Sequence, residues 1–349
     1  MQKGKAAWAV TINDIALEAG VSTATVSRTM RGKEWVSPET REKIFRVARR
    51  LNYHPNLQAR ALVSKNPNGV GIVIPRTAEF AFANPYYAEN IKGIAKRVKE
   101  SGQHLVFSFA GDDSYAQMYQ NRLVAGIIVL GHRIDDPRIE QAGKMKVPMV
   151  LIPGYPHSHS IPSVDMDNIG GAHKAVDYLA GLGHQRIAFI NGAINSKYSI
   201  DRLKGYRNGL EKNNLPFQGN LVFESDFTQE GAYRVMKKIL LGPKIPTAVL
   251  LINDHSALGA LKAVKESTYQ VPEDISIVGF GDVPFASMLY PPLTTVREPS
   301  QEIGYEAAGM FLKLIQGKRI PQRHLTVPME LIVRESTAPP LDLKRKKIR

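Results

Sequence analysis

The sequence contains no cysteine, and this absence removes several kinds of chemistry together. Disulfide bonds, thiolate nucleophiles, iron–sulfur clusters and cysteine-ligated zinc sites are excluded. A metal site would need histidine and carboxylate ligands, which His157, His159 and Asp165 could supply in principle. A stretch rich in proline, serine and histidine without fixed ligand spacing is more typical of an ordinary loop. We therefore expect no metal and no cofactor.

Long apolar runs and catalytic motifs are also missing. No stretch approaches the roughly 20 apolar residues of a membrane-spanning helix, and the N-terminus lacks the apolar segment of a signal peptide. These absences predict a cytoplasmic protein with no membrane partner. The patterns GxxxxGK[ST], GxGxxG after a strand, HExxH and GxSxG do not occur either. We therefore expect no catalytic residues and no enzyme activity.

Acidic residues are too few to balance the basic ones, and the formal net charge over 349 residues is +14. The excess is uneven, because residues 1–66 contain 12 basic and 5 acidic residues and the last nine residues add five bases against one acid. A basic segment attached to a nearly neutral body is typical of a nucleic-acid-binding protein. By charge alone, a solvated surface explains the excess equally well.

The basic N-terminal segment has the pattern of three short helices. They begin after Thr11, Ser22 and Ser37, whose side chains can each cap a helix, and Gly20 permits a sharp turn between the first two. The second helix is predicted to run from Thr23 to about Met30. Apolar side chains at helical spacing give the three helices a shared core: Ile12, Ile15, Ala16, Ala19, Val26, Ile44, Val47, Ala48 and Leu51.

Two helices joined by a tight turn, the second short and ending in arginine, indicate a helix-turn-helix DNA reader. A helix deep in the major groove needs small residues where its backbone approaches the bases, and a long donor that can pair with guanine. Thr23 and Ala24 meet the first need, and Arg28 meets the second. The alternative is a plain three-helix surface domain whose Arg28 meets only solvent.

The segment TINDIALEAGVSTATVSR, followed by VSPETREKIFRVARRLNYHPNLQARAL, resembles the N-terminal module of the LacI/GalR family of bacterial transcription repressors. The resemblance implies double-stranded operator DNA as a partner. It places Thr23, Ala24 and Arg28 at base-reading positions and makes Ser22, Thr25 and Ser27 candidates for phosphate contacts. It also implies a hinge helix over residues 56–63 that contacts DNA through Asn56, Ala59 and Leu62, with Leu62 inserted in the minor groove. The alternative for Leu62 is a linker residue without a DNA role.

Beyond residue 69, short apolar strands alternate with helical patterns. The strands are VGIVIP, HLVFSF, AGIIVLG, PMVLIP, RIAFING, NLVFES, TAVLLIND and ISIVGFGD. Alternation of this kind predicts an α/β fold with two doubly wound parallel-sheet subdomains. The layout, with RLKGYRNGL, PEDISIVGF and PPLTTV, resembles the periplasmic-binding-protein-like sensor of the same family. We expect a DNA-binding domain over 1–54, a hinge and linker over 55–68, an effector-binding and dimerisation domain over 69–340, and a basic tail over 341–349.

Doubly wound sheets bind ligands beyond the carboxyl ends of their strands. At such positions the resemblance marks candidate effector-binding residues, which are Tyr86, Tyr87, Arg202, Phe227, Asn253, Asp254 and Asp282. Aromatic faces combined with amide, carboxylate and guanidinium groups suit a polyol such as a sugar. Structural alternatives stay open for three of them: Asp254 as a helix cap, Phe227 as a core residue, and Tyr86 facing solvent.

Two stretches depart from the family pattern. The strand ISIVGFGD has Gly281 where relatives carry an acid directly after the aromatic residue, and Asp282 comes one position later. The usual hydroxyl-accepting carboxylate is therefore expected to be missing. The segment between residues 110 and 124 is shorter than usual and leaves about ten residues for a helix of about 15 Å.

These features together predict an effector-responsive transcription regulator, a repressor of carbohydrate-utilisation genes. One small reading helix covers few base pairs, so we expect a homodimer on a near-palindromic operator. The tail LDLKRKKIR lacks leucine heptads, which favours dimers over tetramers. The alternatives are a regulator controlled by a nucleobase or sugar-phosphate co-repressor, and a sugar-processing enzyme with a DNA-binding head.

Overall fold

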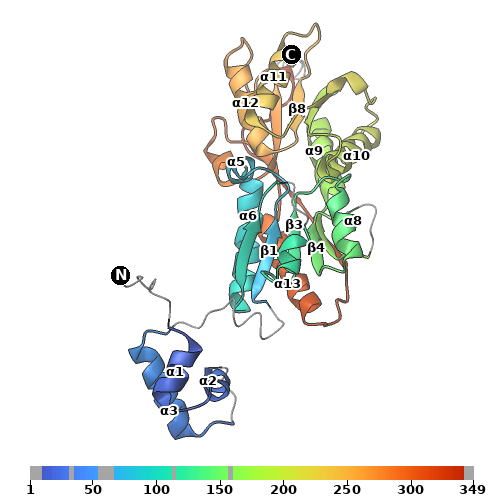
Figure 1. Cartoon of the computed structure of the whole chain (residues 1–349). Helices are drawn as coiled ribbons and strands as arrows, with labels where there is room; N and C mark the ends of the chain where they lie inside the picture. Colours follow the sequence, from blue (N-terminus) through green and yellow to red (C-terminus); the bar gives the residue numbers. More distant parts are fainter. Residues whose placement is uncertain (1–9, 31–34, 54–66, 112–114, 156–159, 342–349) are drawn as a thin grey trace, which may run out of the picture. The chain divides into compact units, whose positions relative to one another are not determined.

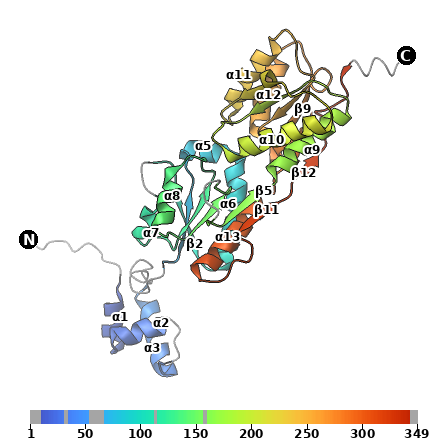
Figure 2. The same ribbon diagram turned by 90° about the vertical axis from the view of Figure 1, so that its right-hand side faces the viewer.

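The computed structural model describes residues 10–30, 35–53, 67–111, 115–155 and 160–341. The chain divides into two compact units, Met1–Asn68 and Gly69–Arg349, called here the head and the sensor (Figure 1, Figure 2). Several predictions lie outside the described residues: the hinge helix with its contacts at Asn56, Ala59 and Leu62, the loop histidines His157 and His159, and the basic tail beyond residue 341.

The head contains the three predicted helices, α1 (Ile12–Ala19), α2 (Thr23–Met30) and α3 (Pro38–Arg50). The capping box of α1 is present, since Thr11 N–H donates to the Asp14 carboxylate at 2.7 Å and the Thr11 hydroxyl accepts from Asp14 N–H at 3.4 Å. The helices share one small core, formed by Ile15, Ala16, Ala19, Val26, Ile44, Val47 and Ala48. Capping residues, the turn at Gly20 and apolar spacing were therefore enough to predict the three helices of this unit.

The sensor has two six-stranded sheets, and each belongs to one lobe. The first lobe contains the order β11-β5-β4-β3-β1-β2, with β1 (Gly69–Val73), β2 (His104–Ser108), β3 (Ile127–Leu130), β4 (Met149–Ile152), β5 (Ser163–Met166) and β11 (His324–Val327). The second lobe contains the order β12-β10-β9-β8-β6-β7, with β6 (Ile187–Asn191), β7 (Val222–Glu224), β8 (Ala248–Leu251), β9 (Ser276–Gly281), β10 (Thr294–Arg297) and β12 (Glu330–Ile332). The prediction of two parallel-sheet subdomains is confirmed, and the pair β10–β12 is antiparallel.

All eight predicted strands are present, but β5, β10, β11 and β12 were not predicted. Their sequences SVDM, TTVR, HLTV and ELI mix polar with apolar residues, and β11 and β12 are partly exposed strands at sheet edges. Continuous apolar runs therefore do not reveal strands that carry polar residues, whether these lie inside a sheet, as β5 and β10 do, or at its edge, as β11 and β12 do.

Helices cover the sheets of both lobes (Figure 2). Those of the first lobe are α5 (Ala78–Ala83), α6 (Pro85–Glu100), α7 (Gln117–Gln120), α8 (Pro137–Lys144) and α13 (Ser300–Ile315); those of the second are α9 (Asn168–Gly181), α10 (Lys197–Lys212), α11 (Gln229–Leu240) and α12 (Asp254–Lys265). Helices α6 and α13 touch closely, because a Cβ on Gly93 would lie 1.9 Å from the Gln301 carbonyl oxygen. The expected ten-residue helix between 110 and 124 was wrong, since α7 has four residues.

The chain passes between the two lobes three times: from β5 to α9, from β10 to α13, and from β11 to β12. Each crossing connects a strand of one sheet to an element of the other lobe. Residues just after a strand are therefore brought close to the opposite lobe. Glu298 follows β10 in this way, and Asn168 opens α9 just after β5.

Candidate DNA-reading helix and effector cavity

The start of α2 is stabilised by hydroxyl groups. The Ser22 hydroxyl accepts from Thr25 N–H at 3.1 Å and lies 2.8 Å from the Thr25 hydroxyl. Ser22 is exposed, and Thr25 and Ser27 are partly exposed. Hydroxyl and backbone N–H groups at a helix start are suitable donors for a phosphate. Phosphate contacts by these three residues remain a prediction.

The two sides of α2 differ in exposure. Val26 and Thr29 are buried against the head core, whereas Thr23, Ala24 and Arg28 are exposed. Helix geometry places these two sets on opposite faces. The exposed face therefore presents two small side chains and one guanidinium group, which is the arrangement expected of a helix that enters the major groove.

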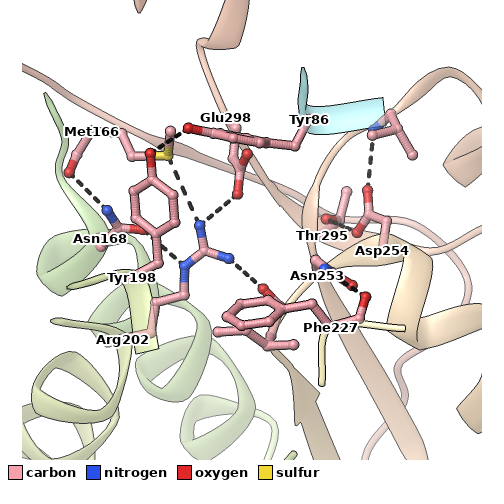
Figure 3. Close-up of polar contacts among 12 residues, drawn as sticks. Tyr86, Met166, Asn168, Tyr198, Arg202, Phe227, Asn253, Asp254, Thr295 and Glu298 are labelled. Carbon is pink, nitrogen blue, oxygen red and sulfur yellow. Dashed lines mark hydrogen bonds and ion pairs between the residues drawn. The ribbon is translucent and has the colours of Figure 1, made fainter. Parts of the chain in front are cut away.

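The sensor contains a cavity of about 450 Å³, and all seven predicted effector-binding residues line it. Its walls come from both lobes: α6 contributes Tyr86 and Tyr87, while α10 contributes Arg202. Figure 3 shows the central part of this site, where side chains from the two lobes point toward one another. Sequence reasoning had not identified Tyr198 and Glu298, which also line the cavity.

Arg202 is buried, with 3% of its surface exposed. Its guanidinium group donates to Asn168 Oδ1 at 2.8 Å, to the Ile252 carbonyl oxygen, and to Glu298 Oε1 at 2.5 Å (Figure 3). It also lies 3.9 Å from the centroid of the Phe280 ring. These contacts join α10 to two of the lobe crossings and neutralise the arginine charge within the protein.

Tyr86 and Tyr198 connect the lobes through their hydroxyl groups, whose oxygens are 2.6 Å apart (Figure 3). Burial raises the pKa of both phenols well above the usual range, so both remain protonated and able to donate. The solvent-facing alternative for Tyr86 is therefore wrong. Tyr198 lies four residues before Arg202 on α10 and so shares its helix face, a spacing that could have predicted it.

Aromatic rings of Tyr87 and Phe227 form further parts of the wall. Tyr87 is buried, and a Cβ on Gly131 would lie 2.8 Å from its hydroxyl oxygen. Phe227 is half-buried, and a Cβ on Gly192 would lie 2.2 Å from its ring. Glycine at these two positions therefore leaves the space that the rings occupy. Phe227 lies at the cavity surface rather than wholly in the core.

Asn253 and Asp254 have different tasks in the protein. Asn253 is the N-cap of α12, and its Oδ1 accepts from Ser256 N–H at 2.6 Å. Asp254 is fully buried; its carboxylate accepts from the Thr295 hydroxyl at 2.6 Å and from Val283 N–H at 3.1 Å (Figure 3). The alternative that Asp254 caps the helix is therefore wrong. Burial raises the pKa of Asp254 to about 7.

Asp282 lines the cavity, but arginines hold its carboxylate. Oδ2 accepts from Arg297 Nε at 2.7 Å, and Oδ1 forms an ion pair with Arg334. The position before it, Gly281, has a φ of 141°, and a Cβ there would lie 3.2 Å from Asp254 Oδ2. The acid expected from the family pattern is thus replaced by a glycine beside a buried carboxyl group.

Restoring that acid with Gly281→Asp is expected to destabilise the sensor by about 1–3 kcal/mol through backbone strain alone. The new carboxylate would also lie beside Asp254, which adds like-charge repulsion. Gly281→Ala is the control, because it introduces the strain without the charge. Urea unfolding should rank wild type above Gly281→Ala and Gly281→Ala above Gly281→Asp. A Gly281→Asp variant as stable as wild type would show that a side chain at this position causes no backbone strain.

Glu298 was missed for a specific reason. It directly follows β10, so the rule that ligand residues follow strands applies to it. The polar strand TTVR was not predicted from its sequence, and the rule was therefore not used there. Recognising the strand would have placed an acid opposite Arg202.

Three further observations concern metal ligands and membrane-spanning helices among the described residues. Asp165, considered above as a metal ligand, accepts from Gly154 N–H at 3.0 Å and pairs with Lys197 at 3.5 Å. Within the described ranges no three histidine or carboxylate side chains are grouped as a metal site. In the same part of the chain, no helix combines the length and the apolar character needed to span a bilayer.

Known proteins resemble both units of the chain. Residues 11–56 match the family model described as bacterial regulatory proteins, lacI family, and residues 176–337 match the periplasmic binding protein-like domain. Catabolite control protein A of Priestia megaterium is 32% identical over 334 residues, covering 94% of this chain and 99% of that protein. The transcriptional repressor CytR of Escherichia coli (strain K12) is 32% identical over 343 residues, which cover 97% of this chain and 99% of CytR.

A solved structure shows the same similarity in three dimensions. The lac repressor dimer bound to operator and the anti-inducer ONPF has a TM-score of 0.84 at 29% identity, covering 95% of this chain and all of that one. The complex of the transcriptional regulator CelR with cellobiose has a TM-score of 0.74 at 31% identity, covering 94% and 99%. Because the similarity extends over nearly the full length of the chain and of its relatives, this protein belongs to the LacI family of bacterial regulatory proteins.

Proposed function

We propose that this protein is a homodimeric repressor of carbohydrate-utilisation genes that binds a near-palindromic operator and responds to a small effector. The observation that carries the proposal is the combination, in one chain, of an exposed DNA-reading helix face with a cavity lined by aromatic, amide and charged groups. The proposal places the protein in the cytoplasm, where bacterial DNA is found. It assigns no catalytic role to any residue.

The relatives support the DNA-binding, dimeric and sugar-responsive parts of the proposal. The lac repressor structure is a dimer on its operator, and CelR was solved with cellobiose. A two-fold dimer would present two α2 helices to two half-sites. Leu62 remains the predicted wedge in the minor groove, where unstacking a base step costs a few kcal/mol and is offset by a larger contact with bent DNA.

Arg28→Ala tests the DNA-reading role. Removing a bidentate guanine contact should cost about 1–3 kcal/mol on the operator and relax the base preference at one position per half-site. The variant should fold normally because Arg28 is exposed. Binding to the operator and to scrambled duplexes, measured by fluorescence anisotropy at one salt concentration, gives the specificity ratio.

Arg46→Ala is the matched control, since it removes the same charge from an exposed position on α3. Any effect of Arg46→Ala should lower the affinity for operator and for scrambled DNA by the same factor. Equal losses on both DNAs with Arg28→Ala would mean that Arg28 reads no base and acts only through its charge.

The effector class is best tested by thermal shift with sugars, sugar phosphates and nucleobases. A ligand at 100 times its Kd should stabilise the sensor by about 2.7 kcal/mol. Stabilisation by a nucleobase alone would favour the nucleobase co-repressor. Turnover of a sugar or nucleotide by the pure protein would favour the sugar-processing enzyme and contradict the proposal.

A further inference from the structure

Two arginines, one in the cavity wall and one beside it, take no part in the contacts described above. Arg76 lies just after β1 and lines the cavity. Arg133 comes just after Gly131 and His132, which follow β3 and also line it. Both arginines are partly buried, and both come from the first lobe. Neither was predicted from the sequence.

Neither guanidinium group has a carboxylate partner within the described residues. Arg76 donates to the carbonyl oxygen of the adjacent Pro75, and Arg133 lies 5.8 Å from the centroid of the Phe227 ring. Arg133 Nη1 is buried and has no hydrogen-bond partner in the described structure. A buried donor without an acceptor costs free energy, so it indicates a site that an external acceptor completes.

Two pairs of charged groups near the centre of the cavity already compensate each other. Arg202 pairs with Glu298, and Asp282 pairs with Arg297. The wall also contains the acids Glu89, Asp254 and Glu302, but none of them forms an ion pair with Arg76 or Arg133 in the described structure. The positive charges of these two arginines are therefore not paired. The charges of Arg76 and Arg133 also act on Tyr87: burial raises the pKa of this phenol, and the two arginines lower it.

Other nearby groups do not pair with these charges. Burial lowers the pKa of Arg133, and the charge of Arg76 lowers it further, as expected for two cations placed near one another. Asp135 and Glu224 oppose this effect, but both are exposed and neither forms an ion pair with Arg133. Burial also lowers the pKa of His132, which therefore adds no positive charge at neutral pH.

We propose that Arg76 and Arg133 bind an anionic group of the effector, which makes the effector a phosphorylated or carboxylated polyol rather than a neutral sugar. Guanidinium groups pair with phosphate and carboxylate oxygens through parallel N–H bonds. Gly281 fits this ligand class, because the missing acid would add a negative charge to the wall. The inference rests on the proposed effector-dependent regulation and specifies the ligand of the same cavity.

Calorimetry on the full-length protein tests the inference with matched sets of probes. Each set contains a free pentose or hexose, its phosphate and its aldonate, and inorganic phosphate is titrated alone. The tightest ligand should carry an anionic group. Binding tightest to a phosphate identifies a phosphorylated effector, and binding tightest to an aldonate identifies a carboxylated one. Both results support the assignment.

Arg76→Gln and Arg133→Gln should each weaken this ligand by about tenfold or more, as expected for the loss of a charge-assisted hydrogen bond. Lys99→Gln is the charge-matched control, because Lys99 is exposed in the last turn of α6. It should leave the affinity unchanged. Thermal melting by circular dichroism checks that every variant is folded.

A neutral sugar that binds as tightly as its phosphate and aldonate would overturn the inference, and so would arginine variants with wild-type affinity for the anionic ligand. In both cases the protein would still be an effector-responsive regulator. If no probe binds, inorganic phosphate included, the anion site is also refuted. A different result contradicts the proposed function itself: a ratio close to one between the affinities of the wild-type protein for operator and for scrambled DNA.

Discussion

Arg202→Ala is expected to lower the free energy of unfolding of the sensor by about 3–5 kcal/mol, because it leaves the Glu298 carboxylate buried without its partner. The side chains of Arg202 and Glu298 are only 4% and 7% exposed, and their ion pair joins α10 to the crossing after β10. The hydrogen bonds to Asn168 and Ile252 are lost in the same substitution. A buried pair with one partner removed is more costly than the same site without charges.

The double variant Arg202→Met with Glu298→Gln separates these effects. It removes both charges and keeps similar volumes, so it should recover most of the stability that Arg202→Ala loses. Urea unfolding followed by far-ultraviolet circular dichroism measures the sensor. Both tryptophans, Trp8 and Trp35, belong to the head, so the unfolding of the sensor is followed by circular dichroism rather than by tryptophan fluorescence.

The same variants distinguish a structural role from a ligand-binding role. If Arg202 only joins the lobes, the double variant should regain the effector response together with stability. If Arg202 or Glu298 also contacts the effector, the response should stay absent in a stable protein, while operator binding without effector remains near wild type. A stable Arg202→Ala protein would show that the pair with Glu298 contributes little.

The head was predictable because its signals are local. Capping residues such as Thr11 and Ser37, a left-handed Gly20 and apolar spacing within a few residues define three short helices. Eight strands of the sensor were predictable for a similar reason, since two-sided burial produces continuous apolar runs. The interior strands β5 and β10 carry polar residues and lack such a run. Both predictions use information contained in a single element.

The site was predictable only in part, because pairings across the lobes depend on tertiary structure. The resemblance brought seven residues to one cavity, yet it did not show that Glu298 holds Arg202 or that Tyr198 meets Tyr86. Arg76 and Arg133 were not predicted, because an arginine indicates a binding site only when no carboxylate pairs with it in the folded protein. That fact appears once the surrounding side chains are placed.

Asp254 is expected to make the stability of the sensor depend on pH. Its pKa is about 7 in the folded protein against 3.8 for an ordinary aspartate, so the folded state binds a proton that the unfolded chain has already released. Below pH 4 the Asp254 carboxyl group is protonated in both the folded and the unfolded state, so its burial does not make the stability depend on pH. Between pH 4 and pH 7 stability should fall by about 1.4 kcal/mol per pH unit, or about 4 kcal/mol in total. Above pH 7 both states are ionised and the slope disappears.

Asp254→Asn should remove this dependence while keeping the geometry. The amide oxygen can accept from Val283 N–H, and the amide nitrogen can donate to the Thr295 hydroxyl, which can reverse its direction. The difference between the variant and wild-type free energies of unfolding, measured in urea from pH 4 to pH 8, should rise in favour of the variant and level off near pH 7.

Taking this difference cancels the contributions of other titrating groups, such as His184, whose pKa burial lowers to about 4. Asp135→Asn, at an exposed carboxylate, should show no comparable rise. Parallel curves for Asp254→Asn and wild type would mean that this carboxyl group is ionised in the folded protein throughout the range, and that its two hydrogen bonds outweigh the cost of burial.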